Sequence, residues 1–335
     1  MATLKDIAQR AGVTATTVSR VINNRGYISE GTRKKVYAAM EEMHYQPNEL
    51  ARAFSKQYTN TIGLIVPHIS HPFFIKVISN LESSAAEKGF KLLLCNSKEQ
   101  PEKEQDYLDM CISNRVAGIV LCSKYVQTRE FRKMNIPVVN LERGGDDDTI
   151  SVQCDNYQGG KLAAEHLIEC GCKNLLHFGG VAGKDMPADR RADGFSDVCK
   201  KAGVPYRILV SDRLQYGSMH YEDFIRRALQ EFPDVDGIFA SSDLIASQVI
   251  QVGAQMGKRV PEDIQLIGFD DVMISTVTTP QITTIHQPVE EMTELCVEYI
   301  AKSLKNESVP QKIVLPVRLG PVSYTHLRAH ETKAN

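Results

Sequence analysis

The side chains with the richest binding chemistry in this chain stand just after short apolar runs. They comprise adjacent aromatic rings, carboxylates, an arginine and an amide, namely Phe73, Phe74, Asp155, Arg191, Asp243, Asp270 and Gln287. Carboxylate and amide groups form paired hydrogen bonds with hydroxyls, and the apolar face of a ligand ring stacks on phenylalanine. Together they indicate a site for a small polyhydroxylated ligand. Each residue alone has a simpler explanation as a helix cap or loop residue, and Asp243 in particular could cap the next helix.

From Thr61 onward, short aliphatic runs alternate with helical stretches, and these elements must position the polar side chains. The runs are 62–66, 91–95, 117–122, 138–141, 174–178, 237–240 and 265–269. Continuous apolar runs of this length predict strands buried on both faces, and helices between them predict parallel sheets. The runs form two successive sets divided near Gln158, which predicts two similar lobes. In such folds ligands bind at the carboxyl ends of the strands, here across a cleft between the lobes.

The first sixty residues follow a different, all-helical pattern. Thr3, Thr14 and Ser29 are N-cap residues, and each precedes a stretch with apolar residues at helical spacing. Gly12 ends the first predicted helix, and only Gly12 and Val13 separate it from the second. This spacing predicts a helix-turn-helix whose second helix protrudes and fits the major groove of DNA, followed by a third helix through Met43.

Charge and composition indicate a nucleic-acid partner for this head alone. The chain has a net charge of −2, with +4 in residues 1–60 and −6 in the remainder. The outward side of the second predicted helix carries hydroxyls, amides and arginines, the groups that contact base edges and phosphates. The DNA-binding candidates are Thr14, Ala15, Thr16, Thr17, Arg20, Asn23 and Arg25. A small helical bundle without DNA-binding function is the simpler alternative.

Several long motifs of the head resemble the lactose/galactose repressor family. They run from Leu4 to Val13, Thr17 to Asn23, Ser29 to Val36 and Tyr45 to Arg52. The resemblance implies that Ala15, Thr16 and Arg20 read bases.

It also implies a hinge helix after Pro47 that forms when two subunits meet on DNA, with an apolar side chain wedged into the minor groove. Phe54 stands where the family usually has leucine. Packing of Phe54 on the body is the alternative.

The body resembles the periplasmic sugar-binding-protein-like core of the same family, through about Gly320. The resemblance is carried by the motifs 155–160, 191–195, 260–264 and 267–271. It places effector contacts on Phe73 or Phe74, Asp155, Arg191, Asp243, Asp270 and Gln287, and it favours a sugar or sugar phosphate over a purine. Within the family the chain looks most similar to sucrose- and ribose-operon repressors.

The expected organisation follows from these patterns and resemblances. The fold class is an all-α head plus an α/β body of two parallel-sheet lobes. The expected domains are a DNA-binding domain, a hinge, an effector-binding and dimerisation domain, and an atypical tail with a foreign or frame-shifted sequence, at residues 1–46, 47–60, 61–320 and 321–335. Lobe 1 is expected at about 61–157 and 288–318, and lobe 2 at about 158–287.

The expected function is that of a homodimeric repressor of a carbohydrate-utilisation operon. It would bind pseudo-palindromic double-stranded DNA under the control of a sugar or sugar phosphate. A doubly wound enzyme is one alternative, because residues 179–185 are similar to a phosphate loop. Such a loop, however, needs glycine where Phe178 stands and Ser/Thr where Asp185 stands. A periplasmic sugar receptor is the other, and the head and the polar first residues oppose it.

Composition supports a cytoplasmic protein that needs no cofactor. No apolar stretch reaches the roughly 18 residues that span a bilayer, so no membrane contact is expected. The eight cysteines form no CxxC pair. We therefore expect reduced thiols, no metal site and no catalytic residues.

Overall fold

The structure is a computed structural model in which the chain forms two compact units, Met1–Asn60 and Thr61–Asn335. It describes residues 2–23, 25–45, 58–123, 125, 136–143, 149–181 and 186–320. Most of the predicted hinge, including Phe54, and the tail 321–335 lie outside these described residues.

The head contains the three predicted helices, α1 (Leu4–Ala11), α2 (Ala15–Ile22) and α3 (Glu30–Glu42). Thr3 caps α1 in a reciprocal arrangement with Asp6, and Thr14 and Ser29 cap α2 and α3 through their side-chain oxygens. Gly12 ends α1 at φ 66°, a left-handed conformation that glycine adopts without steric cost. This turn lets α2 start three residues later, at Ala15.

A small apolar core holds the head together. Its buried members come from all three helices, and they are Ile7, Ala8, Ala11, Val18, Val21, Val36 and Ala39. Because the inward side of α2 is used in this way, its other side faces solvent.

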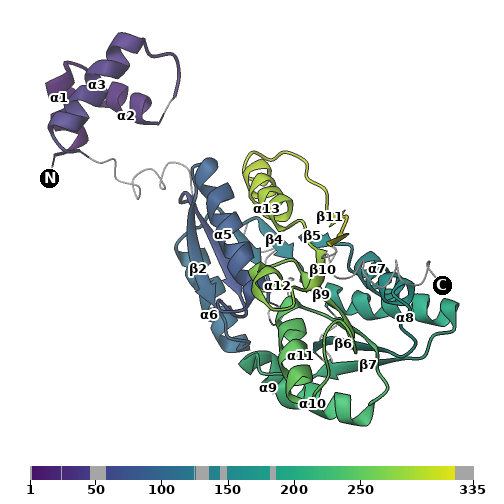
Figure 1. The fold of residues 1–335 in the computed structure, drawn as a ribbon. Helices are drawn as coiled ribbons and strands as arrows, with labels where there is room; N and C mark the ends of the chain where they lie inside the picture. The colour runs from purple at the N-terminus through teal and green to yellow at the C-terminus, as the bar shows by residue number, and fades with distance from the viewer. Residues whose placement is uncertain are drawn as a thin grey trace. The chain divides into compact units, whose positions relative to one another are not determined.

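The body consists of two six-stranded sheets, each with helices packed on it (Figure 1). The first sheet is entirely parallel, in the order β11 (Lys312–Leu315), β5 (Ile150–Cys154), β4 (Val138–Leu141), β3 (Gly118–Leu121), β1 (Thr61–Val66) and β2 (Lys91–Asn96). The second has the order β12 (Arg318–Gly320), β10 (Thr283–His286), β9 (Gln265–Asp270), β8 (Gly237–Ala240), β6 (Leu175–Val181) and β7 (Tyr206–Ser211). Within it β12 alone runs antiparallel to its neighbour.

The helices divide between the two lobes. Lobe 1 holds α5 (Pro72–Glu87), α6 (Pro101–Ser113) and α13 (Val289–Ser303). Lobe 2 holds α7 (Asn156–Glu169), α8 (Arg190–Ala202), α9 (Arg213–Ser218), α10 (Glu222–Glu231), α11 (Asp243–Gln255) and α12 (Met273–Val277), with a 3₁₀ turn at Pro187–Asp189. The predicted fold class, a helical head with a two-lobed parallel α/β body, is confirmed.

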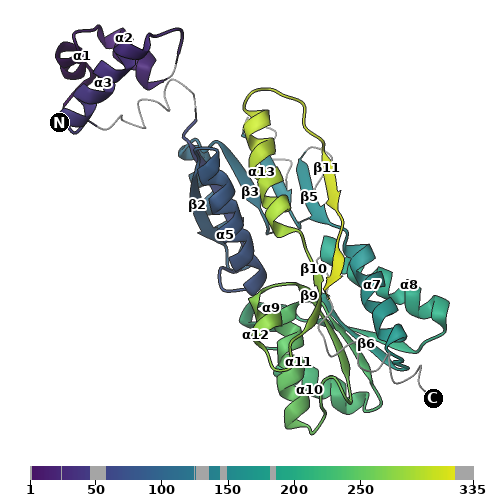
Figure 2. The same ribbon diagram turned by 45° about the horizontal axis from the view of Figure 1, so that its top comes forward.

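The chain crosses between the lobes three times, after β5, after β10 and after β11. Figure 2 shows the last crossing, where β11 lies beside β5 and β12 continues to β10. Lobe 1 is expected to extend to about residue 318, whereas β12 begins at Arg318 in the second sheet. Three crossings make a hinge at which the lobes can change their angle.

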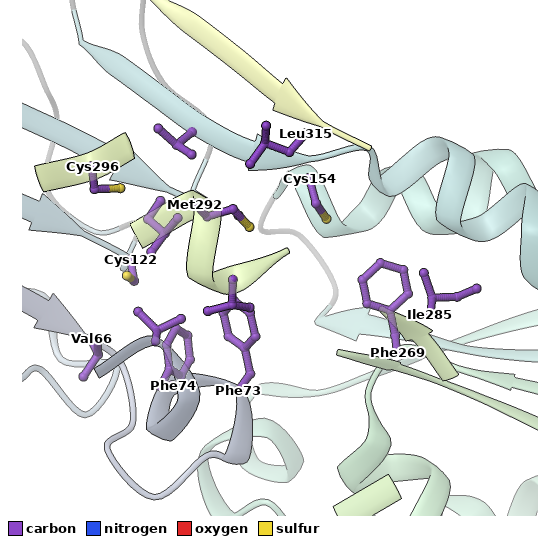
Figure 3. Close-up of a cluster of buried hydrophobic side chains, with 14 of the residues drawn as sticks. Val66, Phe73, Phe74, Cys122, Cys154, Phe269, Ile285, Met292, Cys296 and Leu315 are labelled. Carbon is purple, nitrogen blue, oxygen red and sulfur yellow. The ribbon is translucent and has the colours of Figure 1, made fainter. Parts of the chain in front are cut away.

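One apolar cluster runs through both lobes (Figure 3). It includes Phe73, Phe74 and Met292 of lobe 1 and Phe269 and Ile285 of lobe 2, all buried. The apolar cluster is thus shared by the two sheets, and it supports the strand ends of both lobes from the inside.

His177 of β6 is a buried polar residue in the core of lobe 2. Its ring stacks on Phe239 at a centroid distance of 4.5 Å, lies 5.4 Å from the ring of Phe195, and its Nδ1 bonds the Phe239 carbonyl at 2.9 Å. Burial lowers the pKa of His177 to about 4 from an ordinary value of 6.5. The folded state therefore keeps this ring neutral.

We predict that His177 contributes to acid destabilisation of the body. Between pH 6.5 and 4 the unfolded state binds a proton that the folded state does not, so stability falls as the pH falls, by about 3 kcal/mol over this window. In His177→Gln, denaturant unfolding at a series of pH values should show a shallower loss of stability than in the wild type. An unchanged pH dependence would contradict this role.

Candidate ligand cavity and nucleic-acid interface

A cavity of about 140 Å³ lies between the lobes, at the carboxyl ends of the strands. The predicted residues Phe73, Phe74, Arg191, Asp270 and Gln287 line it together. They come from α5, α8, β9 and the crossing after β10, so both lobes and their connection contribute. The cavity has room for one small ligand.

Arg191 is the buried cation of this cavity, with 6% of the residue exposed. Its Nε donates to Asn156 Oδ1 at 2.7 Å and its Nη1 to the Ser241 carbonyl at 2.5 Å. The guanidinium also lies over the Phe269 ring, 3.4 Å from the centroid. These contacts fix the plane of the guanidinium at the wall of the cavity.

Close packing of α7 against α8 positions Arg191. An added Cβ at Gly160 of α7 would lie 1.9 Å from the Arg191 carbonyl oxygen, and one at Gly194 of α8 would lie 2.0 Å from the Tyr157 carbonyl oxygen. Only glycine fits at such a backbone-to-backbone approach. The two glycines, one in each of the motifs 155–160 and 191–195, therefore allow α7 and α8 to pack backbone against backbone.

Asp270 and Gln287 form the second polar group of the cavity. Gln287 Nε2 donates to Asp270 Oδ1 at 2.6 Å, and both residues are buried. Burial raises the pKa of Asp270 well above its ordinary value, although nearby Arg191 acts in the opposite direction. Gln287 Oε1 is buried without a hydrogen-bond partner, so it can accept a hydrogen bond from a ligand hydroxyl.

Asp243 does not line the cavity, but it bonds residues near Asp270. It is the first residue of α11, whose cap is Ser242, so the alternative that Asp243 caps this helix is wrong. Its carboxylate accepts hydrogen bonds from the Val272 backbone N at 2.9 Å and from Thr284 Oγ1 at 2.6 Å. Burial raises the pKa of Asp243 to about 7.

Asp155 also lies outside the cavity lining. It is the N-cap of α7, and its Oδ1 accepts a hydrogen bond from the Gln158 backbone N at 2.9 Å. The helix-cap explanation therefore accounts for this side chain. Its neighbour Asn156 takes the place next to Arg191.

The lobe 1 wall combines aromatic rings with a neutral imidazole. The rings of Phe73 and Phe74 meet edge to face at 5.2 Å, and His71 caps α5 by accepting from the Phe73 backbone N at 3.3 Å. Burial lowers the pKa of His71 to about 4. This wall offers an aromatic face and one hydrogen-bonding ring without adding charge.

Several lining residues were not among the predicted site residues. They are Glu99, Ser123, Glu142, Tyr216 and Tyr221. The first three follow β2, β3 and β4, so the strand-end rule could have identified them. Tyr216 has no such signal, because the packing of α9 brings it to the cavity. Its ring lies near that of His68, with 5.4 Å between the two ring centroids.

The head presents a polar surface on α2. Thr14, Thr16 and Arg20 are exposed there, as is Arg25 just beyond, while Ala15, Thr17 and Asn23 are half-buried. Thr14 and Thr17 are joined by a 2.9 Å hydrogen bond between hydroxyls, and Asn23 Nδ2 donates to the Ser19 carbonyl at 2.9 Å. Thr16 and Arg20 are four residues apart and therefore share one side of α2.

A helix-turn-helix head joined to a two-lobed body with a ligand cavity defines a ligand-responsive DNA-binding regulator. Residues 3–48 match the model of bacterial regulatory proteins of the lacI family, and residues 164–321 match the periplasmic binding protein-like domain. The chain belongs to the lacI family of bacterial transcriptional regulators.

Relatives of similar length agree with this assignment. The chain is 33% identical to the ribose operon repressor of Halalkalibacterium halodurans, covering 94% of this chain and 96% of that protein. It is 35% identical to the sucrose operon repressor of Pediococcus pentosaceus, covering 94% and 97%. The predicted likeness to ribose- and sucrose-operon repressors is confirmed.

Solved structures show the same architecture. A regulator from Alkaliphilus metalliredigens complexed with D-xylulofuranose is 32% identical, with a TM-score of 0.71, covering 78% of this chain and 98% of that one. The complex of the transcriptional regulator CelR with cellobiose is 27% identical, with a TM-score of 0.69, covering 96% and 99%.

The described residues contain neither a candidate membrane span nor a candidate group of metal ligands. No helix in that part of the chain is both long and apolar enough to cross a bilayer. In the same residues no three His, Cys, Asp or Glu side chains are grouped as ligands for a metal ion.

We predict that Gly160→Ala destabilises the body and displaces Arg191. The new methyl group meets backbone that cannot rotate away, and overpacking of this kind costs about 1–3 kcal/mol. Chemical denaturation should show this loss. Gly217→Ala, where a Cβ meets no atom within 4 Å, is the matched control and should stay near wild type. Equal effects of the two substitutions would contradict the packing argument.

Proposed function

We propose that this protein is a homodimeric repressor of a carbohydrate-utilisation operon, and that a small sugar or sugar phosphate controls its affinity for operator DNA. The observation that carries the proposal is the cavity between the lobes, with Arg191, Asp270 and Gln287 facing aromatic side chains. A ligand that contacts both lobes favours one closure angle, and the lobe angle sets the spacing of the two heads in a dimer.

The chemistry of the cavity supports a sugar. Gln287 Oε1 and the Asp270 carboxylate offer acceptors, Arg191 offers donors, and Phe73 and Phe74 offer apolar faces. This combination matches a ring that carries hydroxyls around an apolar face. The relatives named as ribose and sucrose operon repressors, and the solved complex with D-xylulofuranose, support the same ligand class.

The head supports operator binding through α2. We infer that Thr16 and Arg20 contact base edges, that Thr14, Ala15, Thr17, Asn23 and Arg25 contact the backbone or neighbouring bases, and that Phe54 is the minor-groove wedge. Two heads related by a dimer axis would read a pseudo-palindromic double-stranded operator.

Exposed apolar side chains on the body support a homodimer. Ile75 of α5 is 53% exposed, and Met273 and Val277 of α12 are 77% and 65% exposed. Met273 and Val277 are four residues apart, so they share one side of α12. We assign this surface to the contact between subunits, since large apolar groups at such exposure gain by burial against a partner.

The same proposal makes the protein a cytoplasmic non-enzyme. Its partner is DNA, and relatives with matching length are named as repressors. Control of binding by a sugar needs no bond to be made or broken, so neither a catalytic residue nor a cofactor is required.

We predict that Asp270→Asn weakens sugar binding at least about tenfold, because one acceptor oxygen becomes a donor while the contact with Gln287 can remain. Asp155→Asn is the control. It keeps the α7 cap, lies outside the cavity, and should bind as wild type does. A thermal-shift screen with D-ribose, D-xylulose, sucrose and sugar phosphates, followed by calorimetry, measures both. If Asp270→Asn bound sugar with wild-type affinity, the proposal that Asp270 contacts the ligand would be wrong.

We predict that Arg20→Ala weakens binding to an operator selected from a random DNA library. Loss of one base contact costs about 1–3 kcal/mol, or roughly five- to 150-fold, and relaxes specificity at that position. Lys201→Ala removes an equal charge from the body and should have no comparable effect. Fluorescence anisotropy at fixed salt measures the difference. Equal affinities for Arg20→Ala and wild type would overturn the role of α2.

A further inference from the structure

The turn after β9 holds two consecutive non-glycine residues in left-handed backbone conformations. The φ angle is 108° at Asp270 and 52° at Asp271. Strained residues of this kind persist only where surrounding contacts hold them, and they concentrate at ligand clamps and switches. The Val272 backbone N, bonded to the buried carboxylate of Asp243, anchors the end of the turn.

The two aspartates of this turn have different neighbours. Asp270 lines the cavity and is bonded to Gln287. The carboxylate of Asp271 accepts from His286 Nδ1 at 2.7 Å, and its backbone carbonyl accepts from Lys76 Nζ at 2.7 Å. Any shift of Asp270 on ligand binding is therefore passed to the Asp271 carbonyl through one peptide unit.

Lys76 belongs to α5 of lobe 1, whereas Asp271 belongs to lobe 2. Their hydrogen bond joins the lobes through space, apart from the three chain crossings. It is charge-assisted, and both residues are half-buried, so it is stronger than a solvent-exposed contact of two neutral groups. Opening of the lobes must break it.

We propose that Lys76 is an interlobe positioning residue, which holds the lobes at the angle seen in this structure and couples that angle to the ligand-facing turn at Asp270. The inference rests on the proposed function only in assigning the cavity to a sugar.

The cysteines supply a built-in probe of opening. Cys122 lines the cavity and is 3% exposed, so it becomes accessible when the lobes separate. Cys111 is packed in a separate apolar cluster of lobe 1 with β1 and β3 residues, so it becomes accessible only when that lobe unfolds. Alkylation by N-ethylmaleimide, followed residue by residue by mass spectrometry, distinguishes the two events.

The decisive variant is Lys76→Met in the full chain without added sugar. Cys122 alkylation should become about tenfold faster, a shift of about 1.4 kcal/mol in the opening equilibrium. Cys111 should react as slowly as in wild type. Lys76→Arg retains a donor and should restore slow alkylation, and Lys88→Met, at the other end of α5, should match wild type.

An unchanged Cys122 rate in Lys76→Met would overturn the proposal, and so would equal acceleration of Cys111, which indicates unfolding. Addition of D-ribose and sucrose then tests the ligand separately. If neither sugar slows Cys122 alkylation in wild type while Lys76→Met still accelerates it, the interlobe contact stands and the assignment of these sugars fails.

Discussion

The arrangement of the body depends on one buried cation. Arg191 is buried, and its guanidinium is stabilised by the Asn156 amide oxygen, the Ser241 carbonyl and the face of Phe269. A buried charge without such partners would cost several kcal/mol. These partners come from α7, from the residue after β8 and from β9. Arg191 therefore has all its partners only when these three elements are packed together and α7 contacts α8 through the two glycines.

Ligand recognition and lobe closure meet at the turn after β9. Asp270 has access to the cavity, and its neighbour Asp271 is bonded to lobe 1 through Lys76. Phe73 and Phe74 lie on the same helix as Lys76, so α5 contributes both the aromatic wall of the cavity and the contact with lobe 2. In the proposed mechanism, a ligand that moves either wall changes the lobe angle, and the lobe angle controls the DNA-binding heads.

Periodicity and capping residues predicted the elements of this fold well, because local physics determines them. Thr3, Thr14 and Ser29 cap the helices they were expected to cap, and the apolar runs became strands. The run 91–95 was wrongly expected to be buried on both faces: it forms β2 at the edge of its sheet, where only Cys95 is buried. Residue type alone could not decide which polar side chains reach the cavity. Asp155 caps α7 instead, and Tyr216 is brought to the cavity by the packing of α9. Such outcomes depend on contacts between segments that are distant in sequence.

The most direct test of the account is a linkage measurement with the purified full-length protein. Operator affinity is measured with and without a saturating sugar, and sugar affinity is measured with and without operator. The account predicts that each ligand changes the affinity for the other by the same factor, which for coupled sites is typically about five- to 150-fold. A sugar that binds in the cavity and leaves operator affinity unchanged would contradict the claim that lobe closure controls DNA binding.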